Sequence, residues 1–176
     1  MKIAALDIQG AALIEAEPAG DERGLFARTF CRDEFMRAGL PGEFLQCSTS
    51  FNVRKGTLRG MHFQARPHEE GRLVRCTRGA IHDVVLDLRR DSRSYRKWLA
   101  FELSADNRRA LYIPHGCAHG FQTLADASEV YYQMTANYSA AHSTGVRWND
   151  PAFAIVWPLE QPVLSPRDAA YPDWRG

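Results

Sequence analysis

The stretch AIHDVVLDLRR, residues 80–90, has the clearest repeating pattern in the chain. In an extended strand, every second residue from His82 to Leu88 falls on one face, and every second residue from Ile81 to Asp87 falls on the other. A period of two with many β-branched and aliphatic residues is typical of a β-strand. The stretch therefore predicts a strand with a carboxylate, Asp83, among apolar neighbours.

Shorter runs of the same character fill most of the chain between glycine, proline, aspartate and asparagine turn signals. They cover residues 24–30, 43–51, 57–64, 71–79, 97–104, 110–114, 120–125 and 128–135. Many short strands separated by regular turns indicate an all-β sandwich, jelly roll or barrel. We find no internal repeat or linker, so we expect one domain over residues 1–176.

Two short helices are predicted beside the strands. RDEFMRAGL, residues 32–40, has Asp33 as a candidate N-cap and Gly39 as a stop. SPRDAA, residues 165–170, follows a proline-rich wrap of turns, and Ser165 is its candidate cap. The expected fold is therefore all-β with one or more short helices.

The composition is that of an ordinary globular protein. Of 176 residues, 45% are hydrophobic and the net charge is +1, which argues against nucleic acid or a membrane as partner. No apolar run reaches the roughly 18 residues of a transmembrane helix, and the first residues are too polar for a signal peptide. The four cysteines show no CxxC spacing, which favours reduced thiols in the cytoplasm over disulfides or a thiolate zinc site.

Two segments, residues 59–79 and 112–126, combine glycine with histidine. In outline they resemble the two motifs of the cupin superfamily, a β jelly roll. A metal-binding cupin has HxH in its first motif, but here His62 is followed by Phe63 and Gln64. Because an amide oxygen is a neutral, weak ligand, this exchange removes much of the affinity for a divalent metal. The pattern argues for a metal-free site, and it leaves His62 as a packed core histidine or a catalytic base.

The resemblance becomes specific when longer motifs are compared. Seven motifs are similar, in order and over nearly the whole chain, to those of the dTDP-4-dehydrorhamnose 3,5-epimerase family. They lie at residues 21–30, 56–64, 73–92, 112–126, 131–138, 145–158 and 164–173. The resemblance implies a cupin-type jelly-roll barrel that uses no metal or cofactor and is usually a homodimer. It also implies a substrate that is a nucleotide-linked 4-keto-6-deoxy sugar.

Epimerisation beside a ketone needs a base on one face of the sugar, a proton donor on the other, and a positive group at the enolate oxygen. By resemblance, His62 is the base, and Asp168 is the carboxylate that holds its other ring nitrogen. Tyr132 matches the proton donor, since a phenol is protonated at neutral pH. Only one of Tyr131 and Tyr132 can point into the barrel, because neighbours on a strand face opposite ways.

Arg72 stands where the family usually has a lysine at the enolate oxygen, and arginine replaces a compact ammonium with a planar fork. Arg59 and Arg23 match the family's diphosphate contacts, which suits paired guanidinium hydrogen bonds. The remaining matches are a polar contact, two aromatic positions and a histidine near the C4 oxygen. They are Gln46, Phe26, Tyr138 and His119. Asp83 lies in a predicted barrel strand, where it would support a catalytic histidine.

The resemblance further implies that Arg23 and Phe26 complete the site of the partner subunit. Other positions depart from the family. Arg28 stands where rhamnose-pathway enzymes commonly have glutamate, Ser48 where they have asparagine, and Cys117 where an aromatic residue is typical. The loop before residue 56 is also one residue longer. These departures leave open the base of the nucleotide, the exact sugar, and whether one or both carbons invert.

We therefore predict a cofactor-independent epimerase that inverts C3, C5 or both carbons of an NDP-4-keto-6-deoxyhexose through an enolate. The alternative in the same class is a mono-epimerase or keto-isomerase on a CDP-, GDP- or UDP-linked 4-keto sugar. Two other classes are a metal-dependent cupin oxygenase and a sugar-nucleotide binding module without catalysis. Gln64 argues against the oxygenase. The set of His62, Tyr132 and Asp168 argues against the binding module, because binding alone needs no acid and base.

Overall fold

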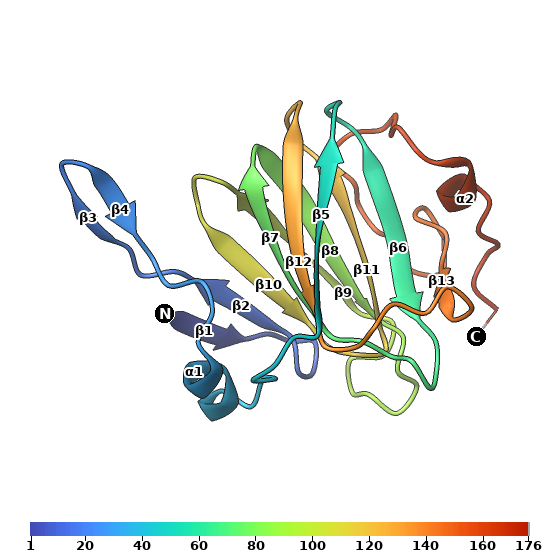
Figure 1. The fold of residues 1–176 in the computed structure, drawn as a ribbon. Helices are drawn as coiled ribbons and strands as arrows, with labels where there is room; N and C mark the ends of the chain where they lie inside the picture. Colours follow the sequence, from blue (N-terminus) through green and yellow to red (C-terminus); the bar gives the residue numbers. More distant parts are fainter. Residues whose placement is uncertain (176) are drawn as a thin grey trace.

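The computed structural model describes residues 1–175, and most of its strands form two facing β-sheets (Figure 1). The six-stranded sheet comprises β1 (Lys2–Ala5), β2 (Ala12–Glu15), β5 (Gln46–Asn52), β7 (Arg72–Arg78), β10 (Arg109–Ile113) and β12 (Ser128–Met134). The five-stranded sheet comprises β6 (Leu58–Gln64), β8 (Ala80–Asp87), β9 (Trp98–Ser104), β11 (Cys117–Thr123) and β13 (Ser143–Gly145). Outside them lie a hairpin of β3 (Ala19–Asp21) and β4 (Gly24–Phe26) and the helices α1 (Arg32–Arg37) and α2 (Pro166–Ala169).

The strand order is β1-β2-β10-β7-β12-β5 in one sheet and β13-β6-β11-β8-β9 in the other. Neighbouring strands within these sheets pair antiparallel. The two sheets make the predicted jelly roll, so the all-β prediction with short helices is confirmed. The order places β11 between β6 and β8, which sets His119 opposite His62 on one side and Val85 on the other.

The strand predicted within residues 80–90 is β8, but other predicted boundaries need correction. Within residues 24–30 only Gly24–Phe26 is a strand, because this hairpin stands away from the sheets and its strand residues are exposed. The sequence analysis missed β1, β2 and β13. β1 is a mostly exposed edge strand and β13 has three half-buried residues, so neither shows an alternating apolar pattern.

The two helices are held in place by different interactions, α1 by packing and α2 by a side-chain cap. The prediction of Asp33 as N-cap is wrong, since α1 begins at Arg32 and its N-cap, Cys31, makes no capping side-chain hydrogen bond. The buried ring of Phe35, packed edge-on against Phe30, fixes this helix instead. In α2 the predicted cap is confirmed, because the Ser165 side chain accepts a hydrogen bond from the N–H of Asp168.

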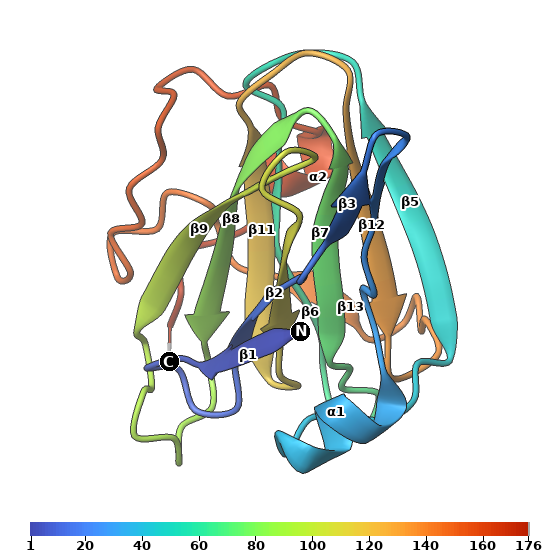
Figure 2. The same ribbon diagram turned by 90° about the vertical axis from the view of Figure 1, so that its left-hand side faces the viewer.

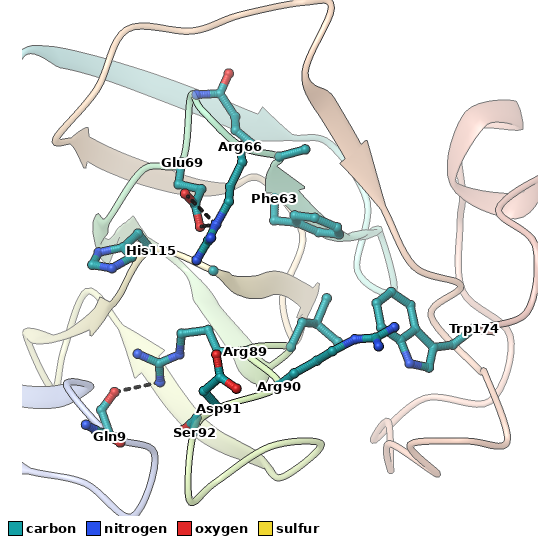
Figure 3. A pocket seen from close by; sticks show the side chains of 14 residues that line it. Gln9, Phe63, Arg66, Glu69, Arg89, Arg90, Asp91, Ser92, His115 and Trp174 are labelled. Carbon is teal, nitrogen blue, oxygen red and sulfur yellow. Dashed lines mark hydrogen bonds and ion pairs between the residues drawn. The ribbon is translucent and has the colours of Figure 1, made fainter. Parts of the chain in front are cut away.

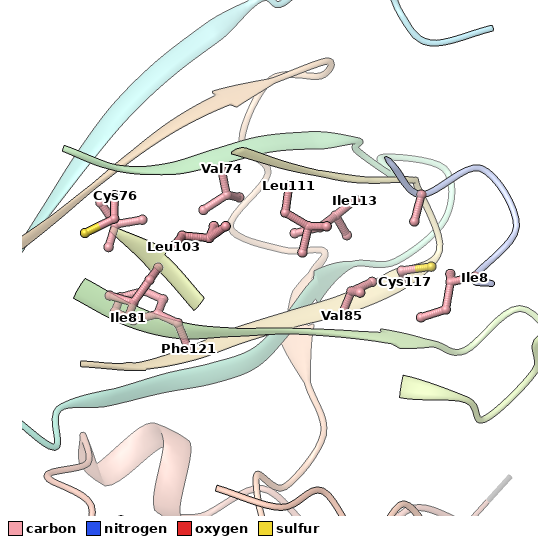
Figure 4. Close-up of a cluster of buried hydrophobic side chains, with 12 residues drawn as sticks. Ile8, Val74, Cys76, Ile81, Val85, Leu103, Leu111, Ile113, Cys117 and Phe121 are labelled. Atoms are coloured by element: carbon pink, nitrogen blue, oxygen red, sulfur yellow. The ribbon is translucent and has the colours of Figure 1, made fainter. Parts of the chain in front are cut away.

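The main core lies between the two sheets. Figure 4 shows Val74 and Leu111 of the six-stranded sheet facing Ile81, Val85 and Phe121 of the five-stranded sheet. Because side chains alternate along a strand, Asp83 of β8 and His119 of β11 share the inward face with these apolar neighbours. The apolar interior therefore encloses two ionisable side chains, Asp83 and His119.

The chain after β12 covers the outer face of the five-stranded sheet. Phe153 and Ile155 pack there on Met61, Val84 and Leu86 in a second buried cluster. The wrap carries α2 to the side of β6 (Figure 1). Its physical role is thus to bring residues far along the sequence next to a strand in the first half of the chain.

The β3–β4 hairpin projects from the barrel on the side away from β6 (Figure 1), and it lies in front of the sheets when that side faces the viewer (Figure 2). In residues 1–175 no helix is long and apolar enough to cross a membrane. All four cysteines are free thiols, as the sequence predicted, and Cys76 and Cys117 are buried.

Gly120 allows β6 and β11 to approach closely. A Cβ at this position would lie 2.7 Å from Sδ of Met61 and 2.9 Å from the carbonyl oxygen of Arg59, which is too close for real side chains. We expect Gly120→Ala to lower the free energy of unfolding by about 1–3 kcal/mol, as overpacking does. Urea unfolding followed by circular dichroism measures this change.

Gly20→Ala in the hairpin is the matched control, since the nearest atom to its Cβ would be 3.4 Å away. We expect that variant to stay within about 0.5 kcal/mol of the parent. A Gly120→Ala protein as stable as the parent would contradict the close approach of the two strands.

Candidate active site

His62 and Asp168 form a hydrogen-bonded pair although they lie 106 residues apart in the sequence. Nε2 of His62 on β6 is 2.6 Å from Oδ1 of Asp168 on α2. The His62 side chain is 30% exposed, whereas that of Asp168 is 5% exposed. The predicted pairing of these two side chains is confirmed as geometry, with the imidazole open to solvent and the carboxylate behind it.

The environment of Asp168 keeps it ionised. Burial alone would raise the pKa of Asp168, but the hydrogen bond and charge of His62, helped by the N–H of Gly60, hold it below its usual range. A carboxylate without a proton can only accept, so Nε2 of His62 must donate. The neutral imidazole then has its free electron pair on Nδ1, the nitrogen available to act as a base.

Tyr132 of β12 points into the barrel, and Tyr131 does not. The ring of Tyr132 packs on the main core and lies 6.0 Å from the ring of His119. Burial raises the pKa of Tyr132 well above its ordinary value, and the nearby charge of Asp83 raises it further, against the opposing charges of Arg72 and Arg59. The phenol therefore stays protonated at neutral pH.

Asp83 supports His119 rather than His62. Its Oδ1 is 2.8 Å from Nε2 of His119, and both side chains are almost completely buried. Within residues 1–175, Oδ2 of Asp83 finds no hydrogen-bond partner. The sequence analysis did not say which site histidine Asp83 would support, and the register of β8, β11 and β6 decides it.

Arg72 begins β7 and enters the same interior. Its Nε and Nη2 donate to Oε1 of Glu70 at 2.9 and 2.5 Å, and its Nη1 donates to the carbonyl oxygen of His62 at 3.3 Å. Arg59 is more open to solvent, and its Nε donates to Oδ1 of the buried Asn52 at 2.7 Å. The sequence analysis missed both partners, Glu70 and Asn52, because no motif marks them.

Gln64 uses both ends of its amide within the fold. Nε2 donates to the carbonyl oxygens of His68 and Asn137 and to Glu70, and Oε1 accepts from the N–H of Ser139. The side chain is 2% exposed. In residues 1–175 no group of three or more His, Cys, Asp or Glu side chains could hold a metal ion. Gln64 thus joins two loops at the position where metal cupins have a ligand.

The rim beside His62 comes from the start of β5, the loop after β12 and the segment that carries α2. Oε1 of Gln46 accepts from the N–H of Tyr138 at 2.6 Å, which ties β5 to the loop that carries this exposed ring. Tyr171 lies 6.1 Å from the His62 ring, and Nε of Arg167 donates to its hydroxyl at 2.9 Å. The sequence analysis missed Arg167 and Tyr171, although both neighbour Asp168 in its motif.

Arg23 and Phe26 lie apart from this group within one chain. They are on the β3–β4 hairpin, on the far side of the barrel from β6 (Figure 1). Arg23 is 85% exposed and pairs with Asp21, and Phe26 is 78% exposed. Arg28 follows the hairpin and pairs with Glu34 of α1 at 3.2 Å. The structure of one chain therefore brings together all the predicted site residues except these two hairpin residues.

A separate cavity of about 560 Å³ opens at another end of the barrel (Figure 3). Phe63, Arg66, Arg90, His115 and Trp174 are among its lining residues. His62, Tyr132 and Asp168 are not. The lining mixes arginines with Glu69 and Asp91, and Arg66 pairs with Glu69 there.

Comparison with known proteins agrees with this geometry. A family model described as dTDP-4-dehydrorhamnose 3,5-epimerase matches residues 5–176. The dTDP-4-dehydrorhamnose 3,5-epimerase of Sinorhizobium fredii is 42% identical over 173 residues, covering 98% of this chain and 89% of the relative. A dTDP-4-dehydrorhamnose 3-epimerase of Streptomyces niveus is 39% identical over 169 residues, covering 96% of this chain and 81% of the relative.

A crystal structure of the dTDP-4-dehydrorhamnose 3,5-epimerase from Bacillus anthracis, with TDP and PPi bound, superposes with a TM-score of 0.95. It is 39% identical, and the match covers 98% of this chain and 99% of that one. The family resemblance predicted from sequence motifs is therefore confirmed. This chain belongs to the dTDP-4-dehydrorhamnose 3,5-epimerase family.

Proposed function

We propose that this protein is a cofactor-independent isomerase that inverts C3 and C5 of a dTDP-linked 4-keto-6-deoxyhexose. The observation that carries the proposal is the 2.6 Å pair of His62 and Asp168 at the edge of a barrel that also holds a partly buried Tyr132, whose raised pKa keeps it protonated. Relatives named for this reaction and for its 3-epimerase form support the same class of chemistry.

The proposed first step is removal of a proton from carbon next to the C4 ketone. Nδ1 of His62 accepts the proton, and the electron pair of the C–H bond moves into the C4 carbonyl to form an enolate. Asp168 stabilises the resulting imidazolium through its ionised carboxylate. N–H groups of Arg72 stabilise the negative oxygen.

The proposed second step returns a proton on the opposite face. Tyr132 donates its hydroxyl proton to the carbon, the C4 ketone re-forms, and the sugar leaves with that centre inverted. The Tyr132 tyrosinate then takes a proton from water, and the His62 imidazolium gives its proton to water, so both side chains return to their starting states. The sequence is repeated at the second carbon, so no oxidant, reductant or metal is required.

The diphosphate of the proposed substrate is anionic, so its binding needs cationic side chains, and these lie outside the barrel interior. Arg59 is exposed next to the site, and its terminal nitrogens are free of the hydrogen bond that Nε makes to Asn52. These nitrogens suit paired hydrogen bonds to phosphate oxygens. Tyr138, 60% exposed on the rim, offers a flat surface for the base or sugar. In this proposal Gln46 fixes Tyr138 rather than contacting the base directly.

We propose further that the protein is a cytoplasmic homodimer in which the hairpin of one subunit completes the site of the other. Leu25 and Phe26 on the hairpin, and Leu45, Phe51 and Val53 along the edge strand β5, are exposed apolar side chains. Covering such an edge is a common reason for association. Arg23 would then reach the diphosphate of the neighbouring site, which its own barrel cannot offer it.

A mono-epimerase is the second candidate, since the 3-epimerase of Streptomyces niveus matches this chain nearly as well as the 3,5-epimerase of Sinorhizobium fredii. Both reactions use the same base, donor and enolate. They differ in whether the sugar can present C5 as well as C3 to His62, which depends on how the bound ring turns.

His62→Ala should abolish solvent exchange at both C3 and C5, because one imidazole serves both carbons. Asp168→Asn keeps the shape but removes the charge, so we expect a rate about 100-fold lower. Proton NMR of dTDP-4-dehydro-6-deoxyglucose in D₂O measures the exchange. His115→Ala, at the separate cavity, is the control and should exchange normally. Wild-type exchange by His62→Ala would show that another group is the base.

Tyr132→Phe removes one hydroxyl and should leave the protein folded. We expect hydrogen at the exchanging carbon to wash out into solvent while inversion fails, since reprotonation then comes from the original face. Tyr131→Phe, the next residue on the opposite face of β12, should behave as wild type. If Tyr132→Phe forms inverted product at the normal rate, the donor is water or another residue.

The shared site can be tested by mixing two impaired variants, His62→Ala and Arg23→Ala. In a mixed dimer one site would contain both substitutions and the other would contain neither. Random exchange of subunits in an equal mixture should therefore restore roughly a quarter of the wild-type sites. If Arg23 acts within its own chain, no site is intact and no activity returns.

A further inference from the structure

We propose that Glu70 is a positioning residue that orients the Arg72 guanidinium toward the enolate oxygen. This inference rests on the role given to Arg72 in the proposed function, and it assigns a part to a residue that carries none in that scheme. Glu70 does not touch the substrate in this account. It acts through Arg72.

The contacts of Arg72 fix its plane at two edges. Oε1 of Glu70 accepts hydrogen bonds from both Nε and Nη2 of Arg72. The carbonyl oxygen of His62 accepts one from Nη1. The side chains of Arg72 and Glu70 are 14% and 6% exposed, so water competes little for these bonds. The guanidinium is thus held between the turn that precedes β7 and the backbone of the base itself.

A count of donors shows what remains for a substrate. A guanidinium has five N–H groups, one on Nε and two on each terminal nitrogen. Three N–H groups of Arg72, one on each nitrogen, donate hydrogen bonds to Glu70 and His62. One N–H on Nη1 and one on Nη2 are left, and the plane fixed by Glu70 sets their direction. These two donors are the ones that can meet the enolate oxygen.

Glu70 is itself held in place. Its Oε2 accepts a hydrogen bond from Nε2 of Gln64 at 3.3 Å. Oε1 of Gln64 in turn accepts a hydrogen bond from the N–H of Ser139. The next residue is anchored too, because the N–H of Gly71 donates to Oγ1 of Thr135 at 2.8 Å. The carboxylate therefore has a defined position from which to orient Arg72.

Physical chemistry explains why such a residue is needed here. A lysine ammonium is a compact charge that can rotate its donors, whereas a guanidinium works only when its plane is correctly turned. Burying the pair adds little stability, since the cost of desolvating two charges roughly cancels their attraction. Glu70 also neutralises the charge of Arg72, so the enolate is stabilised by directed N–H groups more than by net charge.

The first test is Glu70→Gln, with Glu69→Gln as its matched control. Glu69 is the adjacent carboxylate, and among residues 1–175 its one ion pair is with the exposed Arg66. We expect Glu70→Gln to lower kcat between about 10-fold and about 100-fold, as loss of orientation does. KM should stay unchanged, because the lost interaction belongs to the transition state. Glu69→Gln should keep the wild-type kcat, and an unchanged kcat in Glu70→Gln would overturn the proposal.

The second test repeats Glu70→Gln in a protein that carries Arg72→Ala. If Glu70 acts through Arg72, the second substitution should cause no further loss of kcat. An equal loss in both backgrounds would overturn the proposal. Failure of the Glu70 proposal can be told apart from failure of the proposed function, because the His62→Ala and Tyr132→Phe results do not depend on Glu70.

The third test adds methylguanidinium to the Arg72→Ala protein. It does not use the single Glu70→Gln variant, so it remains decisive if that variant fails to fold. Glu70 should hold the added cation where the side chain was, so kcat should rise with its concentration. The same addition to the Arg72→Ala, Glu70→Gln protein should give no rise, because the anchoring carboxylate is gone. Equal rescue of both proteins would show that Glu70 does not orient the guanidinium, and would overturn the proposal.

Discussion

The hydrogen bond between His62 and Asp168 is the contact on which the rest of the site depends. It joins a barrel strand to a four-residue helix that could not hold its position alone. Three constraints place that helix: the cap from Ser165, the N–H of Gly60 reaching back from β6, and the wrap packed on the outer face of the five-stranded sheet. The C-terminal segment therefore delivers a carboxylate to the barrel as well as covering apolar surface.

Three site side chains of the barrel each have a carboxylate as partner. His62 pairs with Asp168, His119 with Asp83, and Arg72 with Glu70. Pairing lowers the cost of placing charge in an apolar interior. The partly buried phenol of Tyr132 remains protonated among charges of both signs.

The fold and part of the site could be predicted from sequence for identifiable reasons. β8 alternates without interruption, so its inward Asp83 was visible in the pattern. His62 and Gln64 could be read from the spacing of one motif. Asp168 could not, because 106 residues separate it from His62 and only the family resemblance linked them.

What the sequence could not show is a set of contacts made by packing. The partner of Arg72 lies two residues away, yet Glu70 and Glu69 look alike in the sequence, and only burial tells them apart. Asn52 likewise has no motif. The start of α1 was mistaken because the burial of Phe35, and not a side-chain cap at Asp33, fixes the helix. The strand residues of the β3–β4 hairpin are exposed, so no contact within one chain marks Arg23 or Phe26 as site residues.

The most direct measurement of the central claim follows the unmodified protein acting on dTDP-4-dehydro-6-deoxyglucose in D₂O, with NMR reading deuterium at each carbon of the sugar. If His62 is a base that serves both carbons beside the ketone, deuterium should appear at C3 and C5 of an inverted product. Deuterium at C3 alone would mean a mono-epimerase. A sugar that carries deuterium at neither carbon would contradict the account.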